Sequence, residues 1–80
     1  MPHDPPPTPA AFGYALRAMR DERNLSQEQL SHATGISVGY ISEIEHGRRS
    51  PSLAILARLA AGFQMPLSEL IAHAERGPRA

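Results

Sequence analysis

The sequence predicts an all-α fold of five short helices, and three observations lead to this prediction. Apolar residues recur about every three to four positions along most of the chain, which is the spacing of one helix face. No segment alternates apolar and polar residues as a half-buried strand would. Ser, Thr and Gly stand repeatedly where such helices would begin or end. With 80 residues and no cysteine, the chain allows one small core and has no disulfide framework.

The domain organisation predicted from composition is a disordered proline-rich arm over 1–8, a helical domain over 9–76 and a tail over 77–80. Four of the first seven residues are proline, which excludes a helix there. The last residues, GPRA, hold a glycine and a proline that would stop the preceding helix.

The first helix is predicted to begin at Pro9 and to end near residue 23. Thr8 is a good N-cap, and proline is well tolerated at the first helical position. One apolar stripe would face the core, formed by Phe12, Leu16 and Met19.

Two shorter helices with tight ends are predicted in the middle of the chain. Ser26 caps the first of them in a capping box with Gln29, and Gly35 ends it as a left-handed residue. Ser37 caps the second, which Gly47 ends in the same way. The inward positions of the two helices are Leu30, Ala33, Ile41 and Ile44.

Two further helices complete the predicted fold. The fourth begins after Ser52, with an apolar face of Leu53, Leu56, Ala57, Leu59, Ala60 and Phe63. The fifth runs from Pro66 to about Arg76, with Leu67, Leu70, Ile71 and Ala74 as its apolar positions.

Charge and composition exclude several classes of function. Eight arginines balance eight acidic residues, so the net charge of zero argues against a non-specific polyanion binder. The four histidines lack ligand spacing, so we expect neither a metal nor a cofactor. No nucleophile–base pair or phosphate loop indicates an enzyme. No apolar run of about 18 residues and no secretory signal is present, so the expected location is the cytoplasm, away from membranes.

The segment from Ser26 to Gly47 combines two short helices and a glycine turn, the arrangement of a helix-turn-helix. The second helix of such a unit fits a DNA major groove. The longer segment 16–71 resembles the XRE family of helix-turn-helix repressors, the group of the phage lambda, 434 and Cro-type repressors. The motifs that carry the resemblance are LSQEQL, GIS, YISEIE with a glycine two residues later, and SPSL, in this order.

The resemblance implies a lambda-repressor-like domain and a sequence-specific DNA-binding transcriptional regulator of the repressor kind. It also implies which residues meet DNA, on the second helix, on the third helix and in the basic loop that follows. These are Gln27, Ser37, Val38, Gly39, Tyr40, Ser42, Glu43, His46, Arg48, Arg49 and Ser50.

Four of the charged and aromatic residues have specific expectations. In the proteins that the chain resembles, an Arg and a Glu at the positions of Arg20 and Glu45 form a structural ion pair between helices. Glu43 has three alternatives: it accepts a hydrogen bond from a cytosine amino group, pairs with Arg48 or Arg49, or is a solvated charge. Tyr40 either donates to a phosphate or only packs on the core.

The resemblance further implies a homodimer on a palindromic operator in double-stranded DNA. The expected dimer interface is Met65, Leu67, Leu70 and Ile71 on the fifth helix and the turn before it. Because the chain stops soon after this helix, no separate ligand-sensing domain is expected. A restriction–modification controller, or an antitoxin with a toxin or another regulatory protein as partner, remains an alternative within this class. From another class, a protein-interaction module that has lost DNA binding remains open.

Overall fold

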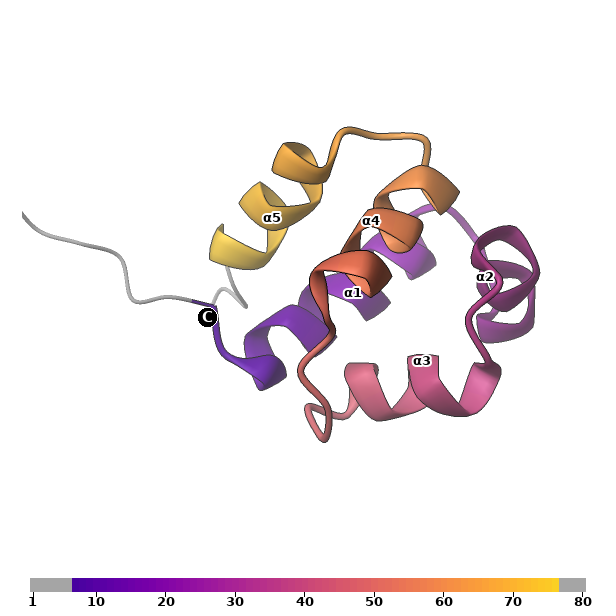
Figure 1. The fold of residues 1–80 in the computed structure, drawn as a ribbon, viewed down its shortest axis with the longest axis horizontal. Coiled ribbons are helices and arrows are strands. Elements are labelled where there is room, and N and C mark those ends of the chain that lie inside the picture. Colours follow the sequence, from indigo (N-terminus) through magenta and orange to yellow (C-terminus); the bar gives the residue numbers. More distant parts are fainter. Residues whose placement is uncertain (1–6, 77–80) are drawn as a thin grey trace, which may run out of the picture.

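The computed structural model describes residues 7–76 and contains five α-helices and no strand in this range (Figure 1). Their bounds are α1 Pro9–Glu22, α2 Gln27–Thr34, α3 Val38–Glu45, α4 Leu53–Gly62 and α5 Leu67–Arg76. The predicted fold class is therefore confirmed, and no helix bound differs from the predicted one by more than a few residues. The predictions for the arm up to residue 6 and for the tail 77–80 lie outside the described residues.

The first four helices begin at the caps that the sequence predicts. The side chains of Thr8, Ser26, Ser37 and Ser52 each accept a hydrogen bond from a backbone N–H in the first turn. The capping box of α2 is complete, because the Gln29 side chain also accepts from the backbone N–H of Ser26.

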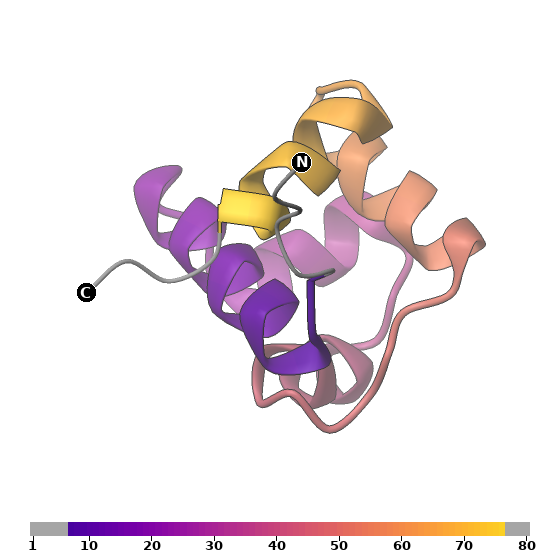
Figure 2. The ribbon, with the colours of Figure 1, turned by 90° about the vertical axis from the view of Figure 1, so that its left-hand side faces the viewer.

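The helices enclose one core, with α3 and α5 on opposite sides of it (Figures 1 and 2). Helix α1 packs against both α3 and α5, while α2 packs against α3 and α4. The largest side chains that are fully buried come from all five helices: Leu16, Met19, Leu30, Ile41, Ile44, Leu59 and Leu70. Helix α3 is thus anchored from two directions, by α1 and by α2.

Gly13 lets α1 and α3 approach closely. A Cβ atom on Gly13 would overlap the carbonyl oxygen of Ile44 and lie 2.8 Å from that of Glu45. These are backbone atoms at the end of α3, which cannot move aside as a flexible side chain can. The absence of a side chain at Gly13 therefore sets how closely α3 lies against α1.

The predicted apolar face of α4 is wrong at two residues, Leu53 and Ala57. Leu53 is 70% exposed, and Ala57 is exposed as well. The stripe to which Leu53 belongs first meets the core one turn later, at Leu56, and continues with Leu59, Ala60 and Phe63. Helical spacing thus identifies most of the buried face, but the packing of the neighbouring helices leaves Leu53 and Ala57 exposed.

Candidate nucleic-acid interface

The turn between α2 and α3 is closed by local hydrogen bonds. Gly35 has a φ of 75°, and its N–H donates to the carbonyl of Ser31. The Thr34 hydroxyl donates to the carbonyl of Leu30 at 2.7 Å and accepts from the N–H of Ile36 at 3.2 Å. The left-handed conformation at glycine reverses the chain within a few residues. It therefore fixes the direction in which α3 leaves the turn.

Helix α3 buries one face and leaves the other open. Ile41 and Ile44 are fully buried, and Ile36 just before the helix is 3% exposed. Within α3 only Gly39 and Glu43 are exposed, and a spacing of four residues puts them on the same face. Of the other predicted DNA-contacting residues on this helix, Val38, Tyr40 and Ser42 are half-buried.

Arg20 and Glu45 form the ion pair that the resemblance implies. Arg20 Nε donates to Glu45 Oε2 at 2.8 Å, and Nη2 donates to Oε1 at 3.1 Å. The side chains are only 12% and 3% exposed, and Arg20 Nη1 also donates to the carbonyl of Leu25 at 2.8 Å. The hydrogen bond with Glu45 raises the pKa of Arg20, against the opposing effect of burial. The pair ties α1 to the end of α3.

Gln27 joins this ion pair, which sequence reasoning missed. Its side-chain Nε2 donates to Glu45 Oε1 at 3.0 Å, linking the first residue of α2 to the last residue of α3. The resemblance implies only a DNA contact for Gln27. A signal for the second role was present in the sequence, since Glu45 has more acceptor sites than one arginine fills.

Glu43, Arg49 and Tyr40 form a cluster at the open face of α3. Arg49 Nε and Nη2 both lie 2.9 Å from Glu43 Oε1, and the guanidinium lies 4.6 Å from the centre of the Tyr40 ring. The hydrogen bond with Glu43 raises the pKa of Arg49. Of the alternatives for Glu43, pairing with Arg49 is therefore present, and the partner is Arg49 rather than Arg48.

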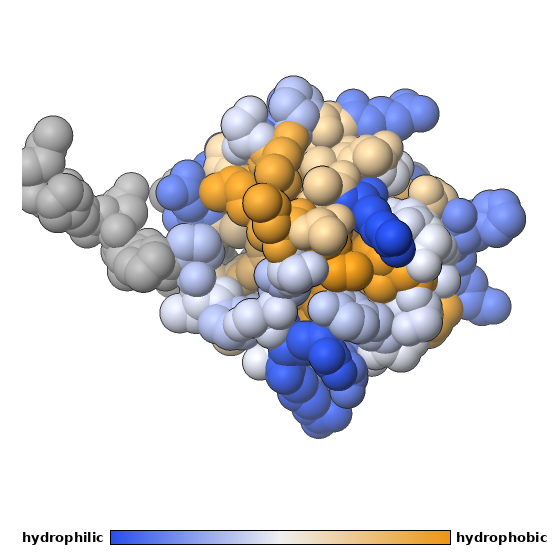
Figure 3. All heavy atoms as spheres, in the orientation of Figure 1, coloured by the Kyte–Doolittle hydropathy of each residue, from blue (hydrophilic) through white to orange (hydrophobic). Residues whose placement is uncertain are grey.

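The loop after α3 brings further polar groups to the same end of the helix. Gly47 has a φ of 71°, and the next N–H, that of Arg48, donates back to the carbonyl of Glu43 at 2.9 Å. The ring Nδ1 of His46 lies 2.7 Å from the carbonyl of Ser42. The exposed residues here are His46, Arg48, Arg49 and Ser50. Figure 3 shows a strongly hydrophilic cluster at the position of this loop.

The predicted dimer interface needs one correction. Leu70 is 1% exposed and belongs to the core, whereas Met65, Leu67 and Ile71 are half-buried. Leu70 is not available for a dimer interface because α1 and α4 cover the inner side of α5. Only the flank of the apolar face of α5 is left accessible. Figure 3 shows hydrophobic side chains over α5 and towards α4 on this side of the molecule.

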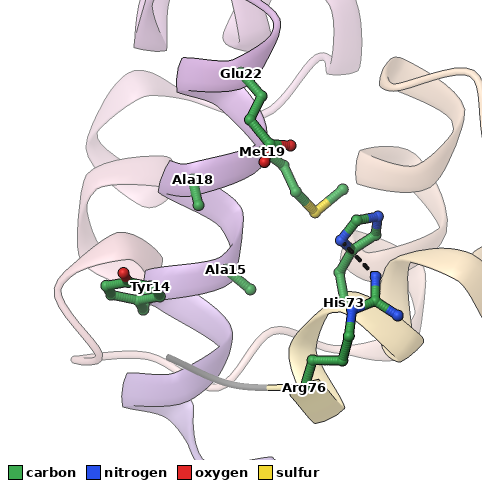
Figure 4. A pocket seen from close by; sticks show the side chains of 7 residues that line it. All are labelled: Tyr14, Ala15, Ala18, Met19, Glu22, His73 and Arg76. Carbon is green, nitrogen blue, oxygen red and sulfur yellow. Dashed lines mark hydrogen bonds between the residues drawn. The ribbon is translucent and has the colours of Figure 1, made fainter. Parts of the chain in front are cut away.

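The other flank of α5 borders a shallow groove against α1, which is lined by both polar and apolar side chains (Figure 4). It has a volume of about 160 Å³, and Arg76 Nη2 lies 2.9 Å from His73 Nδ1 at its edge. This is smaller than the roughly 300 Å³ at which small-molecule sites begin.

Within residues 7–76 no group of three or more His, Asp or Glu side chains is placed to hold a metal ion. In the same range no single helix has the length and hydropathy to cross a membrane, although α4 and α5, bent by 100°, pass that test as a pair.

Comparison with known proteins identifies relatives over most of the chain. Residues 16–70 match the helix-turn-helix family HTH_3. The chain is 40% identical over 62 residues to the HTH-type transcriptional repressor RghR of Bacillus subtilis, covering 76% of this chain and 46% of RghR. It is 38% identical over 66 residues to the control protein C.MunI of Mycoplasma sp, covering 81% of this chain and 89% of C.MunI.

Among solved structures, the fold is similar to the restriction-modification controller protein C.AhdI from Aeromonas hydrophila. The TM-score is 0.74 at 34% identity, over 78% of this chain and 94% of C.AhdI. The chain spans about half the length of RghR and nearly all of the two controllers. The match over residues 16–70, together with the capped helices and the glycine turn, shows that the chain belongs to the XRE-type helix-turn-helix family HTH_3.

Proposed function

We propose that the protein is a sequence-specific DNA-binding transcriptional regulator of the repressor kind, which acts in the cytoplasm as a homodimer on a palindromic operator. The observation that carries the proposal is the placement of α3. The helix is anchored on one face by Ile41 and Ile44 and open on the other, beside a loop with two exposed arginines. Such a helix fits the major groove with its open face towards the base edges.

The surrounding groups suit the phosphates on either side of that groove. The N-terminus of α2, at Gln27, presents backbone N–H groups and the positive end of the helix dipole. On the other side, Arg48 and Ser50 are exposed in the loop after α3. Contacts of this kind set the position of the protein but do not distinguish sequences. Base readout then falls to Glu43 on the open face of α3, together with the exposed cap Ser37 and the half-buried Val38 at the start of the helix.

The proposed dimer sets the distance between the two copies of α3. We propose that Met65, Leu67 and Ile71 meet the same residues of a second copy, because their apolar surface is only partly covered within the monomer. A twofold axis through this surface would place two copies of α3 in successive major grooves about 34 Å apart. The operator is then an imperfect palindrome.

The test is a selection of operators from random double-stranded DNA, followed by salt titration of the tightest binder. Because Arg48 contacts phosphate in this proposal, Arg48→Ala should weaken binding to all sequences alike and lower the salt slope by about one ion. Arg17→Ala is the matched control, since this exposed arginine lies on α1 and faces Asp21. A wild-type chain without salt-dependent binding at low ionic strength would contradict the proposal.

A restriction–modification controller is the second candidate. The observation that favours it is the extent of the match, which covers 89% of C.MunI and 94% of C.AhdI. The selected operator should then occur upstream of the genes for a restriction endonuclease and a methyltransferase. An operator found only elsewhere would argue against this candidate and leave the general proposal intact.

A further inference from the structure

Glu43 is the one exposed side chain within α3, because the other exposed residue of that helix is Gly39. No atom lies within 4 Å of a Cβ built on Gly39, so the surface one turn before Glu43 is open. If α3 enters a major groove as proposed above, the Glu43 carboxylate is the longest side chain that the helix itself presents to the bases. The inference drawn from it rests on that proposed function.

A bare carboxylate is poorly suited to a major groove, because the phosphates on both sides repel it. Glu43 is not bare: Arg49 lies 2.9 Å from its Oε1 through both Nε and Nη2. The pair carries no net charge, so most of the repulsion is cancelled. Both donors meet the same oxygen, and no group between residues 7 and 76 donates a hydrogen bond to Oε2.

Tyr40 holds the arginine in this position. The Arg49 guanidinium stacks 4.6 Å from the centre of the Tyr40 ring, and Tyr40 in turn packs against the hydrophobic core. The arginine belongs to the loop, while Glu43 and Tyr40 belong to α3. The stack and the ion pair together therefore fix the loop arginine beside the helix.

We propose that Tyr40, Arg49 and Glu43 act as one base-reading unit specific for a C·G pair. Arg49 neutralises Glu43 and engages Oε1, and Oε2 accepts a hydrogen bond from the N4 amino group of cytosine. Recognition of cytosine by Glu43 and the ion pair of Glu43 with Arg49 then occur together and are not alternatives. Arg49 is a positioning residue for the readout, in addition to any phosphate contact that it makes.

Cytosine is the expected base because the amino groups of cytosine and adenine have different neighbours on the major-groove edge. A carboxylate oxygen only accepts hydrogen bonds, so it selects the amino groups of cytosine and adenine among major-groove edges. In adenine the amino group lies beside N7, a second acceptor that repels the carboxylate. In cytosine the amino group has C5–H on one side, and its only neighbouring acceptor on the groove edge is O6 of the paired guanine. A Gln at position 43 reverses this preference, because its amide both donates and accepts.

The experiment measures base preference with the full 80-residue chain. Operators are selected with the wild type, and each base at every half-site position is then varied in a competition assay. The wild type should prefer cytosine at one position per half-site by about tenfold or more over the other bases. Glu43→Gln should shift that position towards adenine. Arg49→Ala should lose the cytosine preference there, whereas the neighbouring Arg48→Ala should weaken all sequences equally and keep it.

Tyr40 supplies a matched pair of variants. Tyr40→Phe retains the ring and should keep the cytosine preference. Tyr40→Leu retains apolar packing but not the stack, and should reduce the preference several-fold at the same base position. Circular dichroism confirms that each variant is folded before binding is measured.

Three results overturn the inference, and they are distinguishable. If Glu43→Gln and Arg49→Ala bind with the same base preference as the wild type, Glu43 is only a charge partner and the inference fails alone. The same holds if Glu43→Gln binds every sequence more tightly, because Glu43 would then be competing with DNA for Arg49. If the wild type binds no operator at any salt concentration, the proposed function fails and the inference with it.

Discussion

Within residues 7–76, Glu45 accepts more side-chain hydrogen bonds than any other acidic residue, two from Arg20 and one from Gln27. Its removal leaves a guanidinium that is 12% exposed without its carboxylate. Breaking a buried pair from one side is costly, so Glu45→Ala should lower the free energy of unfolding by about 3 kcal/mol. Urea denaturation measures the change, and a domain of this size should lose roughly 10–20 °C in Tm.

Glu22→Ala is the control for this prediction. Glu22 is 69% exposed and lies 4.0 Å from Arg23, so its loss should change the free energy of unfolding by less than about 0.5 kcal/mol. Equal stability of Glu45→Ala and wild type would show that the Arg20–Glu45 pair does not hold α3 in place.

Substitution of a helical glycine by alanine should have opposite effects on the free energy of unfolding at Gly13 and at Gly39. In Gly13→Ala the new methyl group overlaps backbone carbonyls of α3, so α1 and α3 must separate. The free energy of unfolding should fall by about 1–3 kcal/mol, despite the better helix propensity of alanine. In Gly39→Ala the methyl group meets no atom within 4 Å, and stability should rise by about 0.5–1 kcal/mol. Thermal unfolding of both variants checks this, and a more stable Gly13→Ala would contradict it.

At the scale of the helices, α1 to α4 share one structural feature at their C-terminal ends. Each is followed by a residue with a positive φ: Asn24 at 55°, Gly35 at 75°, Gly47 at 71° and Gln64 at 57°. The sequence predicts the two glycines but not Asn24 and Gln64, because only glycine identifies a left-handed residue by itself. At the end of α4, the N–H of Met65 donates to the carbonyl of Ala60, which requires the left-handed residue between them.

Gln64 is therefore strained where Gly35 and Gly47 are not. Gln64→Gly should raise the free energy of unfolding by about 0.5–1 kcal/mol, because the left-handed conformation costs a residue with a Cβ more than it costs glycine. Asn24→Gly should have a smaller effect, since asparagine tolerates this conformation. Chemical denaturation of the two variants compares them, and a larger gain at Asn24 would be inconsistent with this account.

For the whole molecule, the two flanks of α5 differ in chemistry. One, together with the turn before α5, carries the half-buried Met65, Leu67 and Ile71. The other borders the groove that Tyr14 of α1 lines with His73 and Arg76 (Figure 4). If the first flank forms the dimer, Ile71→Lys should shift the dimer equilibrium towards the monomer by more than about tenfold, because a charge would be buried at the interface. Sedimentation equilibrium measures the shift.

Tyr14→Lys is the matched control for the dimer prediction. Tyr14 is 54% exposed on the other flank, so the substitution also adds a lysine to an exposed hydrophobic position. The dimer constant should not change. If the dimer constant responded to Tyr14→Lys but not to Ile71→Lys, the interface would instead lie at the groove between α1 and α5.

By itself the sequence determined the five helices, most of their ends and the helix-turn-helix unit. Caps, capping boxes and C-terminal glycines are local, since each involves residues only a few positions apart. The inward stripe of Phe12, Leu16 and Met19 follows from helical spacing in the same way, and all three are buried. The resemblance added the pair of Arg20 and Glu45, which spacing alone does not predict.

The tertiary structure alone decided where each face of a helix ends and which polar groups meet. Leu53 and Leu70 look alike in the sequence, yet one is 70% exposed and the other 1%. Helical spacing identifies a face, but burial depends on how far the neighbouring helices extend along it. The links from Gln27 to Glu45 and from Glu43 to Arg49 depend on the crossing of α3 with its neighbours and on the path of the loop after it. A hydrogen bond forms only where two chain segments are held within about 3 Å, and this closeness is a property of the packed chain.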